Sequence, residues 1–457
     1  MTQHTTQTVL FPDLFHKPVV ATFSQAQSSS DGGAILLKGA DHQLSLTERL
    51  AQCIDDKRQD GKVDHTVLDL LRQRVYGIAC GYADCNDSRA LANDPVQKLL
   101  LDRDPIEGQS LGSQPTLSRF ENAVSGRDLL RMAETLADIV VEHHQERLDG
   151  QVRRITIDLD PTDDPTHGAQ QLTFFNGHYG SYCYLPMVGT LQFDNEPEKY
   201  LFTVVLRPGN AHSSRGVTAI LMRLVPRLRE AFPKARLRVR LDGGFATAEV
   251  LGFLDDLEQE RVEYLVGIAG NSVLDRVVAP SMKRVRALSQ ASGKTETRFG
   301  ETRYAAKTWP RRRRVIFKAE VVRLDGRLPR DNARFVVTNL TYKPERVYQI
   351  YRQRGDMENR IKELHHGLEI DRTSCTNFKA NQLRVLMTAA AYVLMQLIRR
   401  QAIHTELASA QVTTLRERLF KLAVSVARSV RRIVLHLPQS YPWLHTWRTV
   451  ARALGAV

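Results

Sequence analysis

Four aspartates lie close together in the segment TIDLDPTDDPTHG, residues 156–168. Asp158 and Asp160 end the strand-like run ITIDLD, in which they share one face, and Asp163 and Asp164 follow the proline. Carboxylates crowded this closely repel one another, and burial raises their pKa unless a cation compensates. The segment is therefore either a metal site or a solvated turn, and other parts of the chain must decide between the two.

A second acid stands at the end of another strand-like run. In VRLDGGFATAEV, Asp242 follows alternating apolar residues and precedes Gly243 and Gly244, which permit a sharp turn and the close approach of a ligand. Asp160 and Asp242 would both lie at carboxyl ends of strands, where ligands collect in open α/β sheets. An ordinary turn is the alternative for each of them.

The third acid is Glu358, in the helical segment YQIYRQRGDMENRIKELHHG. At about 100° per residue, one helix face collects Tyr351, Arg354, Glu358, Lys362 and His365. An apolar stripe lies beside this face, and the solvent side is expected to carry Asp356, Arg360 and Glu363. Glu358 would thus line a cleft among basic and hydrogen-bonding side chains. The alternative is a surface ion pair with Lys362, one turn later.

Carboxylates from two strand ends and a later helix are typical of two-metal phosphoryl transfer, in which the metals clamp the attacking and leaving oxygens. Mg²⁺ prefers such oxygen ligands. We therefore expect Asp160, Asp242 and Glu358 to be catalytic and to bind two Mg²⁺ ions, for which Mn²⁺ can substitute. Asp158 is an alternative first ligand, because it shares a strand face with Asp160.

The overall charge favours a polyanionic partner. Lys and Arg total 64 against 51 Asp and Glu, which gives a net charge of +13, and nucleic acid is the commonest partner of such a chain. The basic segments WPRRRRVIFK and RSVRRIVLHL are expected to follow a DNA backbone; a solvated basic face is the alternative. The first segment contributes Arg311, Arg312, Arg313 and Arg314.

Cysteine usage and hydropathy limit the cellular compartments that fit the sequence. The five cysteines are scattered without a CxxC pair, which fits a reducing compartment better than a disulfide framework. The N-terminus lacks the pattern of a signal peptide. The longest near-apolar run, Met387–Ile398, is too short to span a bilayer and is expected to be a buried helix, so no membrane partner is predicted.

The order of elements predicts an α/β protein with helical regions at both ends. We expect an extended arm over residues 1–30, a helical DNA-binding region over 31–148, and alternating strands and helices over 149–271. A β-rich insertion would follow over 272–340, then the closing acidic helix over 341–400 and a basic helical region over 401–457.

Several separated segments resemble, in order, insertion-sequence transposases of the DDE superfamily, and most closely the insertion-sequence-1380 family. They are SSSDGGAILLK, LLRQRVYGIACGYADCND, SQPTLSRFEN, DLDPTDDPTHG, FFNGHYGSYCYLPM, LDGGFA and YRQRGDMEN. Asp160 followed by Thr162 resembles the D-x-T element of the first catalytic strand, and Asp242 matches the second acid. The resemblance covers nearly the whole chain.

Glu358 resembles the third acid within the Y-(2)-R-(3)-E-(6)-K signature of the related insertion-sequence-4 group, with Tyr351 and Arg354 in place. His365 occupies the lysine position of that signature, and Lys362 stands one turn earlier. Tyr351, Arg354, Lys362 and His365 are therefore expected to bind DNA.

The resemblance implies an RNase H-like core, a mixed sheet with flanking helices, interrupted by a β-strand insertion before the last acidic helix. It also implies cleavage at the terminal inverted repeats of a transposon and transfer of the freed 3′-hydroxyl to target DNA. A homodimer on double-stranded DNA and a bacterial, nucleoid-associated place in the cytoplasm are expected with it. An RNase H-like endonuclease without strand transfer and an inactive DNA-binding derivative are the alternatives.

Overall fold

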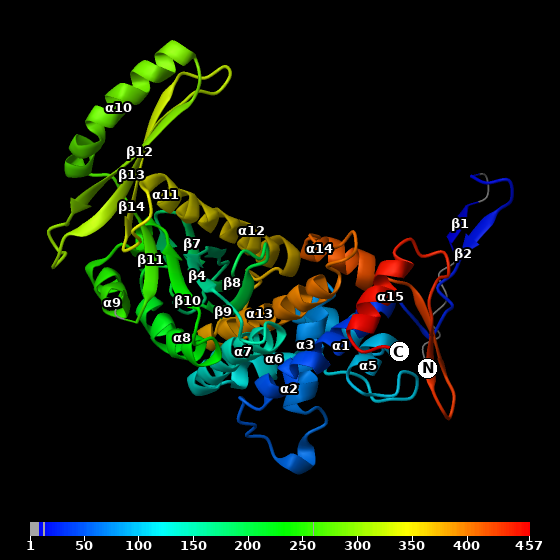
Figure 1. The fold of residues 1–457 in the computed structure, drawn as a ribbon. Coiled ribbons are helices and arrows are strands. Elements are labelled where there is room, and N and C mark those ends of the chain that lie inside the picture. Colours follow the sequence, from blue (N-terminus) through cyan, green and yellow to red (C-terminus); the bar gives the residue numbers. More distant parts are fainter. Residues whose placement is uncertain (1–8, 12–13, 259) are drawn as a thin grey trace.

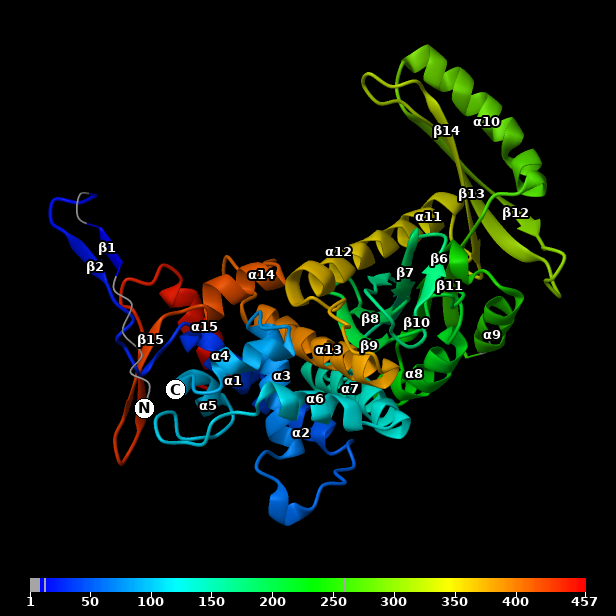
Figure 2. The ribbon, with the colours of Figure 1, turned by 180° about the vertical axis from the view of Figure 1, so that it is seen from behind.

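The computed structural model describes residues 9–11, 14–258 and 260–457. These residues form an elongated molecule with a mixed sheet toward one end, a helical body in the middle and two hairpins near the chain termini (Figures 1 and 2). None of the helices in this described part combines the length and the apolar composition that a bilayer crossing requires.

The mixed sheet has eight strands, in the order β12-β13-β14-β11-β10-β4-β8-β9. The strands β4, β10 and β11 are parallel to one another, and every other neighbouring pair is antiparallel. Their bounds are β4 Arg154–Pro161, β8 Met187–Phe193, β9 Tyr200–Val205, β10 Arg236–Leu241, β11 Val262–Ile268, β12 Glu296–Tyr304, β13 Arg313–Val322 and β14 Arg330–Thr338. The predicted alternation of strands and helices with parallel pairing is confirmed.

The two faces of β4 have different roles because successive side chains of a strand point to opposite sides. Ile155, Ile157 and Leu159 belong to the main apolar core, which also takes in α8 (Val217–Ala231) and α9 (Ala248–Glu258). Asp158 and Asp160 lie on the other face. On the same side of the sheet, the helix α11 (Pro344–Arg352) packs against β11, β12 and β13, partly through a second, smaller apolar cluster.

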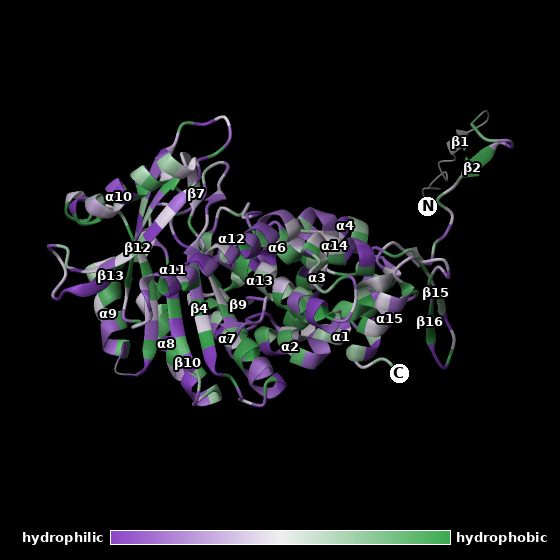
Figure 3. Ribbon diagram, turned by 45° about the horizontal axis from the view of Figure 1, so that its top comes forward, coloured by the Kyte–Doolittle hydropathy of each residue, from purple (hydrophilic) through white to green (hydrophobic). Residues whose placement is uncertain are grey.

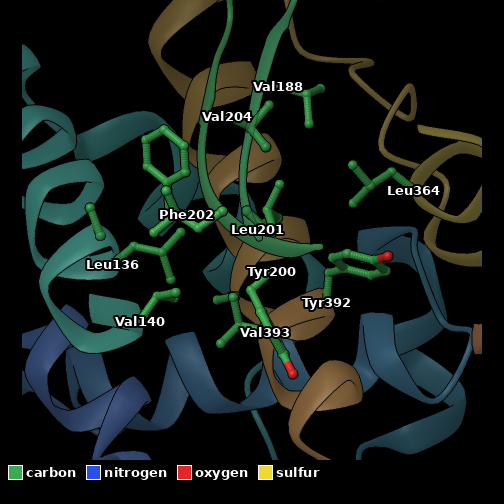
Figure 4. Close-up of a cluster of buried hydrophobic side chains, with 14 of the residues drawn as sticks. Leu136, Val140, Val188, Tyr200, Leu201, Phe202, Val204, Leu364, Tyr392 and Val393 are labelled. Carbon is green, nitrogen blue, oxygen red and sulfur yellow. The ribbon is translucent and has the colours of Figure 1, made fainter. Parts of the chain in front are cut away.

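The helical body is built around α13 (Phe378–Gln401), which is buried along nearly its whole length. This confirms the buried helix expected from Met387–Ile398. The helices around it are α1 Ile35–Leu44, α2 Leu46–Ala51, α3 Val67–Ala79, α4 Ser88–Leu91, α5 Pro95–Leu100, α6 Gln114–Ala123 and α7 Gly126–Arg147. Figure 4 shows where the body meets the sheet: Leu136 and Val140 of α7 and Val393 of α13 surround Leu201 and Phe202 of β9.

The segment expected to be a β-rich insertion differs from the prediction in two ways. It begins with a 21-residue helix, α10 (Ser272–Ser292), capped by Asn271, whose side chain accepts from the backbone of Val273 and Leu274. The strands β12, β13 and β14 then continue the main sheet from β11, so they form no separate sheet. The helical spacing of the buried residues Leu274, Val278, Met282 and Val285 was the signal for α10.

The C-terminal region, expected to be helical throughout, contains a β-hairpin. The strands β15 (Val424–Arg428) and β16 (Ile433–His436) pair with each other, and β15 also pairs with β3 (Ser28–Ser29) near the N-terminus. Val424 and Val426 are buried while Ser425 and Ala427 are exposed. This period of two is the strand pattern that the helical interpretation overlooked. The helices α14 (Val412–Leu415) and α15 (Leu444–Ala453) flank the hairpin.

The described part of the N-terminal arm also forms strands. β1 (Val9–Phe11) and β2 (Val19–Ala21) make an antiparallel pair that projects from the body (Figure 1). Figure 3 shows that β2 is hydrophobic, although its residues are exposed. The extended arm expected over residues 1–30 thus contains β1, β2 and β3, and its residues 1–8, 12 and 13 lie outside the described part of the chain.

Candidate active site

Asp160 is the penultimate residue of β4 and is nearly buried. One of its carboxylate oxygens, Oδ2, accepts a hydrogen bond of 2.7 Å from Nη1 of Arg354. Burial raises the pKa of Asp160 to about 7; the nearby Arg354 opposes this rise, and the charge of Asp242 adds to it.

Strand register explains why Asp242 lies near Asp160. Asp158 of β4 pairs with Arg240 of β10, and the two strands are parallel. Two residues further on, Asp242 follows the end of β10 beside Asp160, across an inter-strand spacing of about 4.8 Å. The side chain of Asp242 accepts from the backbone N–H of Gly244 at 2.9 Å, which caps the short turn Gly243–Phe245.

Gly244 is required at this turn. A Cβ atom there would lie 2.8 Å from the hydroxyl oxygen of Ser213 and 3.3 Å from the carboxylate of Asp242. Gly244 therefore lets the chain turn directly against the acid; the close approach of a ligand at the Gly-Gly pair stays a prediction.

Glu358 lies on α12 (Asp356–Lys362), which follows α11 after the 3₁₀ turn Gln353–Gly355. Arg354, one turn before Glu358, contacts Asp160. His365, two turns after Glu358, has its Nε2 2.9 Å from the hydroxyl of Thr162. Both contacts reach the carboxyl end of β4, and they stand before and after Glu358 in the chain. The side chain of Glu358 itself is exposed.

The alternative interpretations of this helix can be compared with its contacts. In the described part of the chain, Glu358 and Lys362 form no ion pair within 4 Å. Arg354 forms its ion pair with Asp160 of the sheet. Among the described residues, no ion pair joins Arg354 to Glu358. Lys362 is exposed, and His365 is held between Thr162 and Asp371, whose carboxylate is 3.3 Å from Nδ1.

Tyr351 lies over the turn that follows Asp242. A Cβ atom on Gly267 of β11 would be 2.4 Å from the hydroxyl oxygen of Tyr351 and 3.0 Å from the backbone nitrogen of Gly243. The phenol therefore packs against the bare backbone of Gly267, beside the end of β10. Burial raises the pKa of Tyr351, with the charge of Arg354 opposing the rise.

The donor set suits a hard divalent cation. Asp160, Asp242 and Glu358 offer only carboxylate oxygens, the ligand type that Mg²⁺ and Mn²⁺ accept. Within the described residues, however, no three His, Cys, Asp or Glu side chains are gathered as a metal-binding group. The guanidinium of Arg354 supplies the positive charge beside Asp160 in this arrangement. The chemistry of the donors fits the ions, and binding them requires the carboxylates to draw together.

Asp158 has a different environment from Asp160, although it lies only two residues away. It is fully buried, and Arg240 grips both of its oxygens at 2.8 and 2.7 Å. The amine of Lys199 is 3.1 Å from one of the same oxygens. Burial would raise the pKa of Asp158, but the charges of Arg240 and Lys199 hold it below its usual value. Both oxygens are engaged, which favours Asp160 over Asp158 as a metal ligand.

The arginine run Arg311–Arg314 is mostly engaged within the protein. Arg313 is buried, pairs with Asp255 at 2.5 Å and lies over the ring of Trp309. Arg311 pairs with the same aspartate at 2.6 Å. Arg314 pairs with Glu301 and donates to the carbonyls of Leu340 and Tyr342. Arg312 is exposed. The expectation that all four follow DNA is thus not supported for Arg313, whose guanidinium is enclosed.

One part of the acidic helix differs from the sequence-based expectation. Glu363, placed on the solvent side, is buried at the start of a π-helical turn (Glu363–Gly367). It accepts from the hydroxyl of Tyr392 and from Arg399 of α13, both at 2.6 Å. Arg360 reaches Glu198 and Glu363 at 3.0 Å each. α13 covers this side of the helix. The arginines near the end of α13, in the sequence LIRRQ, were the signal that an acid of the acidic helix could be buried there.

Lys199 and Arg240 are the residues of this region that the sequence analysis did not single out. Arg240 alternates with apolar residues in the run RLRVRL, two positions before Asp242. A cation placed on the inner face of a central strand implies a buried anion opposite it. That rule, applied to the register with Asp158, would have found Arg240; Lys199 carries no comparable signal.

Comparison with known proteins bears directly on this arrangement. No curated protein matches the chain. The family described as transposase DDE domain group 1 matches residues 11–457. Because this match takes in nearly the whole chain, including both strand ends and the acidic helix, the protein belongs to the transposase DDE domain group 1 family.

Proposed function

We propose that this protein is an insertion-sequence transposase, of the insertion-sequence-1380 kind, that cleaves the ends of its element and joins the freed 3′-hydroxyl to target DNA. Family membership supports a transposase acting on DNA. The observation that carries the finer proposal is the placement of Asp160 and Asp242 at adjacent parallel strand ends, with the helix of Glu358 contacting the same strand end through Arg354 and His365.

The strand order supports an RNase H-like core. The strands β4, β8 and β9 form an antiparallel meander. The strands β10 and β11 then lie on the other side of β4, parallel to it, which gives the order β9-β8-β4-β10-β11. The segment from α10 to β14 enters between β11 and the acidic helix. We propose that this segment is the insertion of the DDE architecture, in a form that extends the sheet.

In the proposed reaction, Asp160, Asp242 and Glu358 hold two divalent metal ions. When bound, these ions would activate the attacking oxygen and stabilise the leaving oxygen of the phosphodiester. Asp160 can bind a metal ion only after its carboxyl group has lost its proton. Because burial raises the pKa of this group to about 7, metal binding near neutral pH would be coupled to the loss of that proton. With Asp160 as a ligand of such an ion, Arg354 would no longer be needed as its counter-ion and could grip a phosphate in a bidentate fork.

The DNA partner is proposed from charge and position. Tyr351 and Arg354 lie beside the two strand ends, and the exposed Lys362 follows on the same helix. His365 would act by holding the helix against Thr162, next to Asp160. The net charge of +13 suits double-stranded DNA, both transposon ends and target, and two ends call for a homodimer in the DNA complex.

A cleavage and joining assay tests this proposal. With DNA that carries the inverted repeats of the element, the unaltered protein should cut at the ends and join them to target DNA in Mg²⁺ or Mn²⁺. Asp242→Asn should abolish both steps and leave end binding intact, because the carboxylate serves the metal. Cutting without joining would identify a nuclease, and binding without cutting an inactive derivative.

A further inference from the structure

The buried group formed by Asp158, Arg240 and Lys199 connects two parts of the candidate site. All three side chains are about 1 % exposed. Arg240 and Asp158 face each other across paired strands, and Lys199 comes from the segment just before β9. A charge group enclosed to this degree costs free energy to desolvate, so its presence calls for a role beyond stability.

The two cations of this group have second contacts, and both reach the same short segment. Nη1 of Arg240 donates to the carbonyl of Ile350 at 3.1 Å and is 3.3 Å from the side-chain oxygen of Gln353. Nζ of Lys199 donates to the carbonyl of Gln353 at 2.9 Å. Ile350 lies in the last turn of α11, and Gln353 opens the 3₁₀ turn that leads into α12.

These contacts suit the chemistry of a helix end. The last carbonyls of a helix lack intrahelical partners and carry partial negative charge, which cations stabilise. Here the helix changes to a 3₁₀ turn at Gln353–Gly355, where the carbonyl of Gln353 also accepts from the backbone N–H of Asp356. Arg240 and Lys199 add side-chain donors to the carbonyls of Ile350 and Gln353. The next residue, Arg354, then reaches Asp160, and Glu358 follows one turn later.

We infer that Asp158, Arg240 and Lys199 form a clamp that positions the α11–α12 junction over the end of β4, and thereby sets where Arg354 and Glu358 lie relative to Asp160. Asp158 orients the two cations, and the cations hold the backbone of the junction. The three are positioning residues, since they act through the helix and not on DNA. The inference rests on the proposed function for its effect on cleavage.

Lys199→Met is the direct test, because methionine keeps an apolar stem and removes the amine. In hydrogen exchange on the full chain, we expect faster exchange over residues 353–362 and unchanged exchange in β4 and β10. In the cleavage assay, the rate should fall by about 10- to 100-fold, the range typical of residues that orient metal ligands. End binding should remain, and half-maximal cleavage should require more metal.

Arg238→Met is the matched control. Arg238 lies two residues before Arg240 on the same face of β10, is buried, and pairs with Glu263 at 2.5 Å. This variant loses a buried cation of the same strand but touches a different part of the sheet. It should lower the melting temperature without faster exchange over residues 353–362.

Gln353→Ala provides a milder variant should Lys199→Met not fold. It removes the exposed side chain that contacts Arg240 and buries no charge, so we expect a smaller increase in exchange over the same residues. Unchanged exchange at the junction in the folded variants, or the same increase in Arg238→Met, would overturn the clamp. Hydrogen exchange does not depend on cleavage activity. A protein that cuts no DNA would therefore refute the proposed function, whereas the exchange measurements would still decide whether the clamp holds the junction.

Discussion

At the scale of single residues, two aspartates in one strand have opposite electrostatic situations. Two buried cations hold the pKa of Asp158 low against its burial. For Asp160, burial raises the pKa to about 7; Arg354 opposes this rise and Asp242 adds to it. A carboxylate with a shifted pKa beside another acid at a strand end is typical of a functional site. The sequence alone left the choice between the two open, because it does not specify which cations lie opposite each of them.

Arg354→Ala tests the role of the guanidinium beside Asp160. It removes the 2.7 Å contact and leaves Asp160 next to Asp242 without a counter-ion. With saturating Mg²⁺ the protein should stay folded, because the metals supply the missing charge, while cleavage at the element end falls by at least about 10-fold. Arg352→Ala, an exposed change two residues earlier, is the control and should cleave normally. A variant that melts early yet cleaves normally when folded would make Arg354 structural.

Asp164 gives a prediction about stability and pH. It is fully buried, and both of its oxygens accept from the hydroxyl of Thr373 at 2.9 and 2.8 Å. Burial raises its pKa to about 8, with the Thr373 hydrogen bond opposing this rise. A carboxyl that binds its proton more tightly when folded stabilises the fold at low pH and loses this contribution as pH rises from about 4 to about 8.

Asp164→Asn should therefore flatten the loss of unfolding free energy over this range, and at pH 8 the variant should be more stable than the unaltered protein. Denaturant unfolding at a series of pH values measures the effect. Equal pH dependence in both proteins would contradict the assigned pKa.

At the scale of elements, the run Arg311–Arg314 contains both a buried and an exposed arginine. Arg313→Gln should lower the free energy of unfolding by on the order of 3 kcal/mol, because it breaks a buried ion pair with Asp255. Arg312→Gln should leave stability unchanged, since Arg312 is exposed. Thermal unfolding of the two variants decides the point, and equal melting temperatures would show that the buried pair contributes nothing.

Periodicity predicted several elements well. The strand faces of β4, the parallel β4–β10 pair and the buried α13 all follow from spacings of two or of three and four. The helix α10, the continuation of the sheet through β14 and the β15–β16 hairpin were not predicted. The spacing of the buried residues in α10 and β15 was a local signal for both elements. The continuation of the sheet through β14 and the pairing of β15 with β3 are long-range contacts, which local pattern does not encode.

The interruptions of the acidic helix were also beyond prediction. The 3₁₀ turn at Gln353–Gly355 and the π-helical turn at Glu363–Gly367 depend on partners outside the helix. Lys199, Arg240 and Arg399 supply these partners, from three different elements or connections. Sequence spacing placed Asp160 and Asp242 at strand ends and Glu358 in a helix, but it could not give the side-chain contacts made by these two turns.

At the scale of the whole molecule, the chain carries a net charge of +13 and forms an elongated body (Figures 1 and 2). DNA binding should therefore weaken steeply with salt, with a slope of log K against log salt of about −0.9 per phosphate neutralised. Arg312→Gln should make this slope shallower by up to about one phosphate, whereas the buried Arg313 should not contribute. Fluorescence anisotropy over a salt series measures it, and an unchanged slope in Arg312→Gln would leave that residue on a solvated face.

The central claim is that Asp160, Asp242 and Glu358 hold the metal ions of a strand-cleavage reaction. Metal-specificity rescue tests it most directly, because a thiolate binds Mg²⁺ poorly and softer divalent ions better. Asp242→Cys, with Asp160→Cys and Glu358→Cys beside it, should bind element ends, fail to cleave in Mg²⁺ and regain cleavage in Mn²⁺ or Cd²⁺. Normal cleavage by Asp242→Cys in Mg²⁺, or metal-independent cleavage by the unaltered protein, would contradict the claim.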